Sequence, residues 1–357
     1  MVYRTDEEGI MPMTLTKPQK LNPGDKIATV SLSWGIAGES DVRWRYDLAA
    51  RRMKELFGLE CVAAPNSMRG EKYLKENAEA RAEDLIWAFS QTDIKGIIAN
   101  IGGNDSIRLF PYIDYDIIRN NPKVLIGYSD IMDVHLMCLK AGLSTFYGAN
   151  LLPSFGEPYS MPQYTINLFK KTFFDTTPIG IIYSPDSFCC DPHDYKNQTT
   201  ISNFHPCEKY ERLQGQGVVR GRLLGGHTGI KEIDQTPLFA PFEEIDNIIL
   251  FIEDMVEYTT PAAFYNFFIW LDKKDVMPNV KGLIIGRFNE YPENENYKNA
   301  LTRAVNDLGL TDLPILFNMP FGHTSPICAL PYGAMAEIDC DNDLFSILES
   351  GVVECQN

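Results

Sequence analysis

The sequence contains no run of about 18 apolar residues, so we expect no helix that crosses a membrane. Residues 1–13 lack a hydrophobic core segment and include acidic side chains, so they predict an N-terminal extension rather than a secretory signal. Basic residues are outnumbered: 32 Lys and Arg stand against 48 Asp and Glu, which gives a net charge of −16. That charge repels nucleic-acid phosphates and anionic lipids, so we expect neither a nucleic acid nor a membrane as a partner.

Regular cysteine spacing is also missing. The eight cysteines occur at irregular intervals, which favours reduced thiols in a cytoplasmic protein over a disulfide framework. With 357 residues, 45% of them hydrophobic, the chain can build a sizeable core without a disulfide or a structural metal. Its length favours two domains. No motif requires a cofactor, and we expect none.

Strands and helices alternate along the first half of the chain. The predicted strands lie within residues 23–34, 60–64, 96–104 and 123–130, and the predicted helices within residues 41–57, 77–90, 105–111 and 131–141. Alternation at this pace is typical of a parallel sheet with helices on both faces. We therefore predict an α/β domain over residues 14–175.

The pattern changes after residue 175. Residues 184–216 are rich in Pro, Asp, Cys, His and Asn without a clear period, and we interpret residues 176–216 as a linker with a long loop. Apolar strands return from Gly217 and continue, with intervening helices, to short strands around 334–348. We therefore predict a smaller, strand-rich α+β domain over residues 217–357.

Ser129 lies in the segment IGYSD (126–130), between an apolar strand and a helix. A small residue two positions before a serine lets the chain turn sharply and presents the hydroxyl at the end of the strand, as in a nucleophile elbow. The second glycine of the usual G-x-S-x-G pattern is absent, because Ile131 stands there. The pattern alone therefore favours a serine that caps the following helix over a nucleophile.

A second turn, formed by Gly102, Gly103 and Asn104, also ends a strand. In a parallel sheet it can lie beside Ser129, since both turns follow strand C-termini. A backbone N–H of this turn and the N–H that follows Ser129 would then face a developing oxyanion. The alternative is an ordinary tight turn, and a lone Gly-Gly lacks the spacing of a dinucleotide fingerprint.

Two carboxylates compete as the partner of a histidine. Glu253 ends the apolar strand ILFIE, where a carboxylate is costly to bury unless it is paired. Glu257 follows in the same stretch. The functional interpretation is that one of them orients a histidine, and the alternative is a surface carboxylate or a helix cap.

The chain has five histidines, and His323 is the candidate general base because it directly follows an apolar run. His135 lies in an apolar helical stretch, where a hydrogen-bonded core histidine is expected. His227 follows two glycines, and we expect it, with Gly102 and Asn104, to contact the substrate. A lone histidine in a loop is more often structural than catalytic, so His323 does not decide the function by itself.

A cluster of metal-binding residue types lies in the predicted loop. Its members are Cys189, Cys190, His193, His205 and Cys207. Their types suit a tetrahedral zinc site, but their spacing matches no standard one. Reduced thiols in a loop are favoured over a metal site, and no metal is predicted.

Several motifs occur in a fixed order: IGGND, NNPKVLIGYSD, STFYGANLLPSFGE, GRLLGG, ILFIED, GLIIGRF and GHTSP followed by LPYGAMAEID. In this combination, from about residue 14 to about residue 350, the chain resembles the LD-carboxypeptidase family of serine peptidases, most closely its microcin C immunity branch. The resemblance implies an N-terminal domain like the class I glutamine amidotransferases, a smaller C-terminal domain, a cleft between them and a homodimer.

The resemblance also implies a catalytic triad of Ser129, Glu253 and His323, with the N–H groups of Gly103 and Asp130 as oxyanion donors. Two substrates follow from relatives. The immunity branch cleaves an amide that joins a peptidyl or aminoacyl group to a nucleotide, and another branch releases D-alanine from muropeptide tetrapeptides. A non-catalytic binding protein on the same fold is the alternative from another class.

Overall fold

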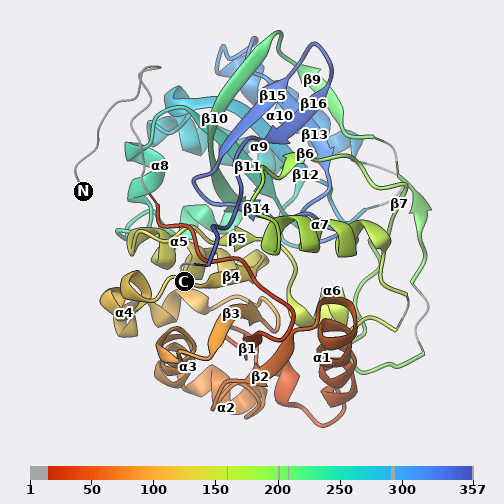
Figure 1. Ribbon diagram of the computed structural model, residues 1–357. Helices are drawn as coiled ribbons and strands as arrows, with labels where there is room; N and C mark the ends of the chain where they lie inside the picture. The colour runs from red at the N-terminus through yellow and green to blue at the C-terminus, as the bar shows by residue number, and fades with distance from the viewer. Residues whose placement is uncertain (1–14, 159, 200–201, 208, 291–293, 356–357) are drawn as a thin grey trace.

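The computed structural model describes residues 15–158, 160–199, 202–207, 209–290 and 294–355, so the predicted extension 1–13 lies outside the described residues. Two large sheets lie one above the other in Figure 1. Within the described ranges, no helix is long and apolar enough to cross a membrane.

The first sheet has six strands in the order β14-β5-β4-β3-β1-β2. Their bounds are Lys26–Val30 (β1), Glu60–Ala63 (β2), Ile94–Ala99 (β3), Val124–Gly127 (β4), Phe146–Tyr147 (β5) and Leu330–Pro331 (β14). The five neighbouring strands β5, β4, β3, β1 and β2 pair in parallel, and β14 pairs antiparallel with β5. The edge strand of this sheet therefore comes from the far end of the chain.

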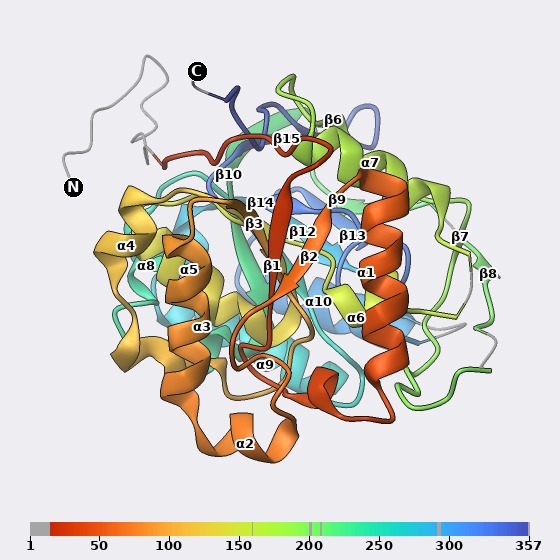
Figure 2. The same ribbon diagram turned by 60° about the horizontal axis from the view of Figure 1, so that its bottom comes forward.

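Helices cover both faces of the first sheet (Figure 2). On one side lie α3 (Ala78–Ser90), α4 (Tyr115–Asn120) and α5 (Met132–Lys140), and on the other lie α1 (Arg43–Phe57) and α6 (Leu151–Phe155). The helix predicted at 105–111 is a 3-10 helix, η2 (Ser106–Tyr112), and Pro111 inside it has no N–H for α-helical hydrogen bonding. The pattern did not predict α6, nor the further helices α2 (Glu71–Glu76) and α7 (Gln163–Phe173).

The second sheet has eight strands in the order β6-β16-β15-β10-β11-β12-β13-β9. Their bounds are Gly180–Ile181 (β6), Glu211–Gln214 (β9), Val218–His227 (β10), Ile248–Glu253 (β11), Val280–Gly286 (β12), Ile315–Met319 (β13), Met335–Asp339 (β15) and Leu344–Ile347 (β16). Strands β10 to β13 are parallel, and the outer pairings are antiparallel. The helices of this half are α8 (Ala240–Glu244), α9 (Pro261–Lys273) and α10 (Glu295–Asp307). The predicted fold class, an α/β half with a parallel sheet and a strand-rich second half, is confirmed.

The stretch interpreted as a linker is more ordered than its composition indicated. Strands β6 and β9 lie at the two edges of the second sheet, and β7 (Ser187–Phe188) pairs with β8 (His205–Pro206). These strands are too short to show a period of two in the sequence. The long stretch between α7 and β10 is thus attached to the second sheet at both of its ends.

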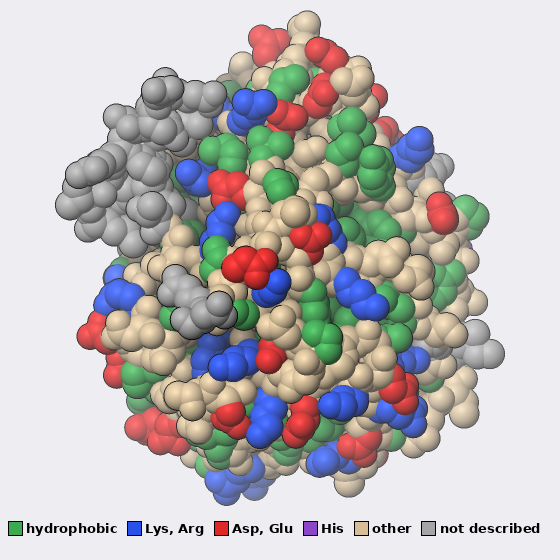
Figure 3. Space-filling model, in the orientation of Figure 1, with side chains coloured by type: hydrophobic (Ala, Val, Ile, Leu, Met, Phe, Trp, Pro, Cys, Tyr) green, Lys and Arg blue, Asp and Glu red, His purple; other side chains and the backbone are tan. Residues whose placement is uncertain are grey.

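Charges are mixed on the surface. The face drawn in Figure 3 carries Lys and Arg side chains interspersed with Asp and Glu, and hydrophobic side chains lie singly or in small groups between them. The net charge of −16 is therefore not gathered into one acidic patch on that face.

Three strands of the two sheets carry candidate residues at or shortly after their C-terminal ends. Ser129 follows β4, Glu253 is the last residue of β11, and His323 follows β13. In parallel sheets such C-terminal ends lie along one edge, which is where loops build binding sites.

Candidate active site

Ser129 begins a 3-10 turn, η3 (Ser129–Ile131), in a left-handed conformation with φ of 64°. Such a conformation costs a non-glycine residue about 1–3 kcal/mol and persists only where the surroundings hold it. Gly127 allows this turn, since a Cβ there would lie 2.8 Å from Ile131 Cγ2 and 3.0 Å from Asn150 Oδ1. The strained turn leaves Ser129 partly exposed at the end of a fully buried strand.

A chain of hydrogen bonds joins the three residues. His323 Nε2 lies 3.0 Å from Ser129 Oγ, and His323 Nδ1 lies 2.7 Å from Glu253 Oε2. An ionised carboxylate only accepts hydrogen bonds, so Nδ1 carries the proton and Nε2 accepts from the serine hydroxyl. The structure therefore brings the three predicted residues together.

Glu253 is fully buried, yet its surroundings favour the ionised carboxylate. Burial raises the pKa of this carboxyl, but the charge and hydrogen bond of His323 and the hydroxyl of Tyr147 outweigh it, and the pKa lies below the ordinary value. Two glycines make room for the carboxylate. A Cβ at Gly322 would lie 2.6 Å from Glu253 Oε2, and one at Gly286 would lie 2.6 Å from Glu253 Cβ.

Tyr147, the last residue of β5, was not singled out from the sequence. Its hydroxyl accepts the N–H of Ser129 at 3.0 Å and donates to Glu253 Oε1 at 2.5 Å. One fully buried side chain thus fixes both the serine turn and the carboxylate. Its place in the segment STFYGAN, on the strand next to β4, is the only signal that pointed to it.

The surroundings of His323 favour its charged form. Burial lowers the pKa of the imidazole, but the charge and hydrogen bond of Glu253, with the charges of Asp254 and Glu257, raise it above the ordinary value. The ring packs edge-on against Tyr128, with centroids 5.0 Å apart. The His323 side chain is still 15% exposed, so a substrate can reach it.

The glycine turn after β3 lies against Ser129, as the parallel sheet predicted. A Cβ at Gly102 would lie 3.2 Å from Ser129 Oγ, and one at Gly103 would lie 2.1 Å from Ser33 Oγ. Asn104 donates its N–H to Ser33 Oγ at 3.0 Å. The absence of a side chain at Gly102 therefore allows the turn to approach Ser129, and its absence at Gly103 allows the turn to pack against Ser33.

The side chain of Asp130 joins the two turns. Its Oδ2 accepts the N–H groups of Asp105 at 3.1 Å and Ser106 at 2.9 Å. Arg81, which is fully buried, holds the same turn through paired hydrogen bonds to the carboxylate of Asp105 at 2.6 and 3.1 Å. The backbone beside Ser129 is thus positioned before any ligand binds.

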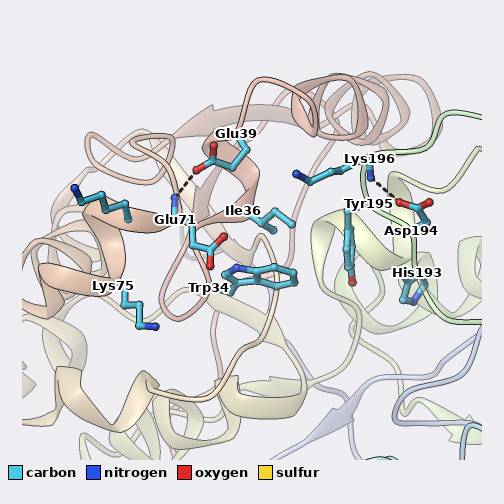
Figure 4. A pocket seen from close by; sticks show the side chains of 10 residues that line it. Trp34, Ile36, Glu39, Glu71, Lys75, His193, Asp194, Tyr195 and Lys196 are labelled. Atoms are coloured by element: carbon cyan, nitrogen blue, oxygen red, sulfur yellow. Dashed lines mark hydrogen bonds between the residues drawn. The ribbon is translucent and has the colours of Figure 1, made fainter.

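Ser129 and His323 open into a cavity of about 350 Å³, a size typical of small-ligand sites, which we call the Ser129 cavity. Gly102 and Gly103 line it as well, and its other walls include Trp34, Tyr128, Asp191, Tyr195, Glu257 and Tyr258. Trp34 and Tyr195 also line an adjoining groove of about 610 Å³ (Figure 4), where their rings meet edge to face with centroids 5.8 Å apart. Two aromatic side chains therefore separate the Ser129 cavity from an outer groove.

A buried ion pair anchors the loop that carries these walls. Arg45 of α1 and Glu157 are 1% and 4% exposed and form a salt bridge, and Glu157 also accepts from His193 Nδ1 at 2.6 Å. Arg45 donates in addition to the carbonyl of Asp194 at 3.0 Å. Residues 191–195 are thereby tied to the first half of the chain.

The remaining candidates have other surroundings. His135 is a buried core histidine, as expected, with ring nitrogens 2.9 Å from Thr145 Oγ1 and from the Gly127 carbonyl, and burial lowers its pKa to about 4. His227 pairs with Glu253 in the β10–β11 register, and its Nδ1 accepts the N–H of Gly229 at 3.0 Å. It is not among the described residues that line the Ser129 cavity, whereas Asn104 lines a neighbouring hollow.

The cysteine and histidine cluster is dispersed into separate contacts. Cys189 pairs by a backbone bridge with Ser325, and Cys207 accepts from Arg287 at 3.3 Å. Among the residues that the structure describes, no three His, Cys, Asp or Glu side chains are grouped to hold a metal ion.

Comparison with known proteins identifies the family. The LD-carboxypeptidase N-terminal domain matches residues 27–148, and the LD-carboxypeptidase C-terminal domain matches residues 220–338. The chain belongs to the LD-carboxypeptidase family. This assignment makes it a serine peptidase or carboxypeptidase by family.

Its relatives include the Microcin C7 self-immunity protein MccF of Escherichia coli, 30% identical over 82% of this chain and 85% of that protein. The structure of MccF in complex with aspartyl sulfamoyl adenosine superposes with a TM-score of 0.82 at 26% identity, and covers 95% of this chain and 100% of that one. An MccF-like protein from Streptococcus pneumoniae in complex with AMP superposes with a TM-score of 0.80 at 30% identity, over 90% and 98% of the two chains. The resemblance to the LD-carboxypeptidase family and to its microcin C immunity branch is confirmed.

We expect Tyr147→Phe to lower kcat without unfolding this LD-carboxypeptidase family member. The change removes one hydrogen bond to a buried carboxylate and one to the Ser129 N–H. A hydrogen bond to a charged group contributes roughly 1.5–3 kcal/mol, which corresponds to about 10- to 100-fold in rate. Steady-state kinetics of the variant measure this loss, and an unchanged kcat would show that Glu253 and Ser129 are held without the tyrosine.

We expect Glu157→Ala to destabilise the protein by about 3–5 kcal/mol, because it leaves Arg45 buried without its charged partner. Urea unfolding measures the change. Glu76→Ala, at an exposed position at the end of α2, is the matched control and should stay within about 0.5 kcal/mol of the wild type. Equal stability of the two variants would contradict the role of the ion pair.

Proposed function

We propose that Ser129, His323 and Glu253 form the catalytic triad of a serine hydrolase that cleaves an amide joining an aminoacyl or peptidyl group to a nucleotide. The observation that carries this proposal is the hydrogen-bonded chain from Glu253 through His323 to Ser129, which ends at a cavity. The same order of carboxylate, imidazole and hydroxyl activates a serine on unrelated folds.

The mechanism follows from the protonation states. Ser129 Oγ attacks the amide carbonyl while His323 Nε2 takes its proton, and Glu253 stabilises the imidazolium that forms. The oxyanion is stabilised by the N–H groups of Gly103 and Asp130. His323 then protonates the leaving amine, and a water molecule, deprotonated by His323, hydrolyses the acyl-serine ester.

The nucleotide part of the substrate is supported by relatives and by the walls of the groove. Complexes of MccF and of an MccF-like protein hold aspartyl sulfamoyl adenosine and AMP. Here Trp34 and Tyr195 present aromatic faces and edges between the Ser129 cavity and the outer groove, and aromatic rings stack on bases. Release of D-alanine from muropeptides remains the alternative. We also expect a homodimer, as the family resemblance implies, in the cytoplasm, as the irregular cysteine spacing predicts.

We expect purified protein to release aspartate from aspartyl sulfamoyl adenosine, and Ser129→Ala to abolish that release. Mass spectrometry of the products, with a muropeptide tetrapeptide as the second substrate, distinguishes aspartate release from D-alanine release. A serine-directed phosphonate should label the wild type at Ser129 and leave the variant unlabelled. If neither product forms and no label is incorporated, the protein is a binding protein and the triad proposal fails.

The pH dependence of kcat/KM should show an acid limb with a midpoint above pH 6.5, the ordinary histidine value. His323 accepts a proton only when it is neutral, and its pKa is raised, so activity falls as the pH drops through that raised pKa. A pH–rate profile with substrate well below KM measures the midpoint. A midpoint below pH 6.5 would mean that burial, rather than the charge of Glu253, dominates the imidazole.

A further inference from the structure

The Ser129 cavity has an unusual charge for a site that acts on anionic substrates. Its described lining includes two carboxylates, Asp191 and Glu257, and no Lys or Arg among the residues that the structure describes. A free carboxylate of a substrate would therefore meet no described Lys or Arg side chain beside the nucleophile. The lysines of this region, Lys72, Lys75 and Lys196, line the outer groove instead.

Both carboxylates are held in place by asparagines. Asn289 donates its Nδ2 to Glu257 Oε2 at 2.8 Å, and its Oδ1 accepts the N–H of Val256 at 2.9 Å. On the opposite loop, Asp191 Oδ2 accepts from the N–H and Nδ2 of Asn203 at 2.7 and 3.2 Å. The two negative charges therefore come from segments far apart in sequence and have fixed positions.

A carboxylate in this cavity opposes the proposed chemistry. Negative charge develops on the substrate carbonyl oxygen in the transition state, and a nearby anion destabilises it. Glu257 is also close enough to act on the catalytic imidazole, because its charge is one of those that raise the pKa of His323. A positive charge on the bound substrate would offset the unfavourable effect of these two carboxylates on the oxyanion.

Resting on the proposed amide hydrolysis, we propose that Glu257, with Asp191, binds a protonated amine on the acyl part of the substrate. The substrate class is then an amide of an aminoacyl group with a free α-amine, rather than one with a free carboxylate at the leaving residue. Glu257 is a specificity-determining residue, and the triad does the bond cleavage.

The test compares aspartyl sulfamoyl adenosine with its N-acetyl derivative, which differs in the charge of the α-amine and keeps the same leaving group. Wild-type protein should prefer the free amine by about 10-fold or more in kcat/KM, the range of one charge-assisted hydrogen bond. Glu257→Gln should lose most of this preference, because it slows the free-amine substrate relative to the N-acetyl derivative. Glu244→Gln, exposed on α8, is the matched control and should keep it.

Both compounds are also tested for how far they slow phosphonate labelling of Ser129, so that a compound which binds without being cleaved still reports its affinity. If the phosphonate labels Ser129 of the wild type but the protein cleaves and binds the two compounds equally well, the inference is overturned and the triad proposal stands. An equal loss on both compounds in Glu257→Gln overturns it as well. A wild-type protein that neither labels nor hydrolyses overturns the proposed function and this inference together.

Discussion

The hydrogen bond between Glu253 and His323 is the contact on which the rest of the site depends. An ionised carboxylate without exposure is strongly unfavourable unless it is paired and fully hydrogen-bonded. Tyr147 and His323 supply these bonds from the two sheets, so the carboxylate is satisfied only when the sheets are docked. Its neighbour Asp254 has a pKa raised by burial and by the charge of Glu253, which opposes a second negative charge at the same place.

The same requirement explains why the two halves of the chain share elements. Strand β14, close to the end of the chain, pairs with β5 directly beside Tyr147. The next residue, Tyr332, donates its hydroxyl to the carbonyl of Gly225 in β10 at 2.9 Å. Ser129, Tyr147 and Glu253 are thereby held in place by contacts that join both sheets. The left-handed backbone of Ser129 is strained, and the packing of these ordered elements offsets that strain.

Much of this architecture could be predicted from the sequence, because alternating strands and helices are local signals. The roles of Ser129, Glu253 and His323 became specific only when several motifs were taken in order, since each one alone also fits a cap or a loop residue. Tyr147 and the Arg45–Glu157 pair could not be predicted, because their partners are 106 and 112 residues away and no local pattern reports such contacts. The strands β6 and β9 were not predicted either, because they are too short to show a period of two and their pairing partners are distant in the sequence.

The site stabilises charge of opposite sign in two different ways. Negative charge on a substrate oxygen would face backbone N–H groups at turns that contain glycine, where no side chain blocks the approach. Such donors are already in position and need no rearrangement when the charge appears. Positive charge on His323 faces carboxylates, and among the described residues Glu253 is the one that hydrogen-bonds to the ring. No described Lys or Arg lines the Ser129 cavity, so a proton gained by His323 adds positive charge directly beside Ser129, in addition to the substrate ammonium proposed above. The local electrostatics therefore favour the imidazolium step of the reaction, and the backbone turns must supply the oxyanion step.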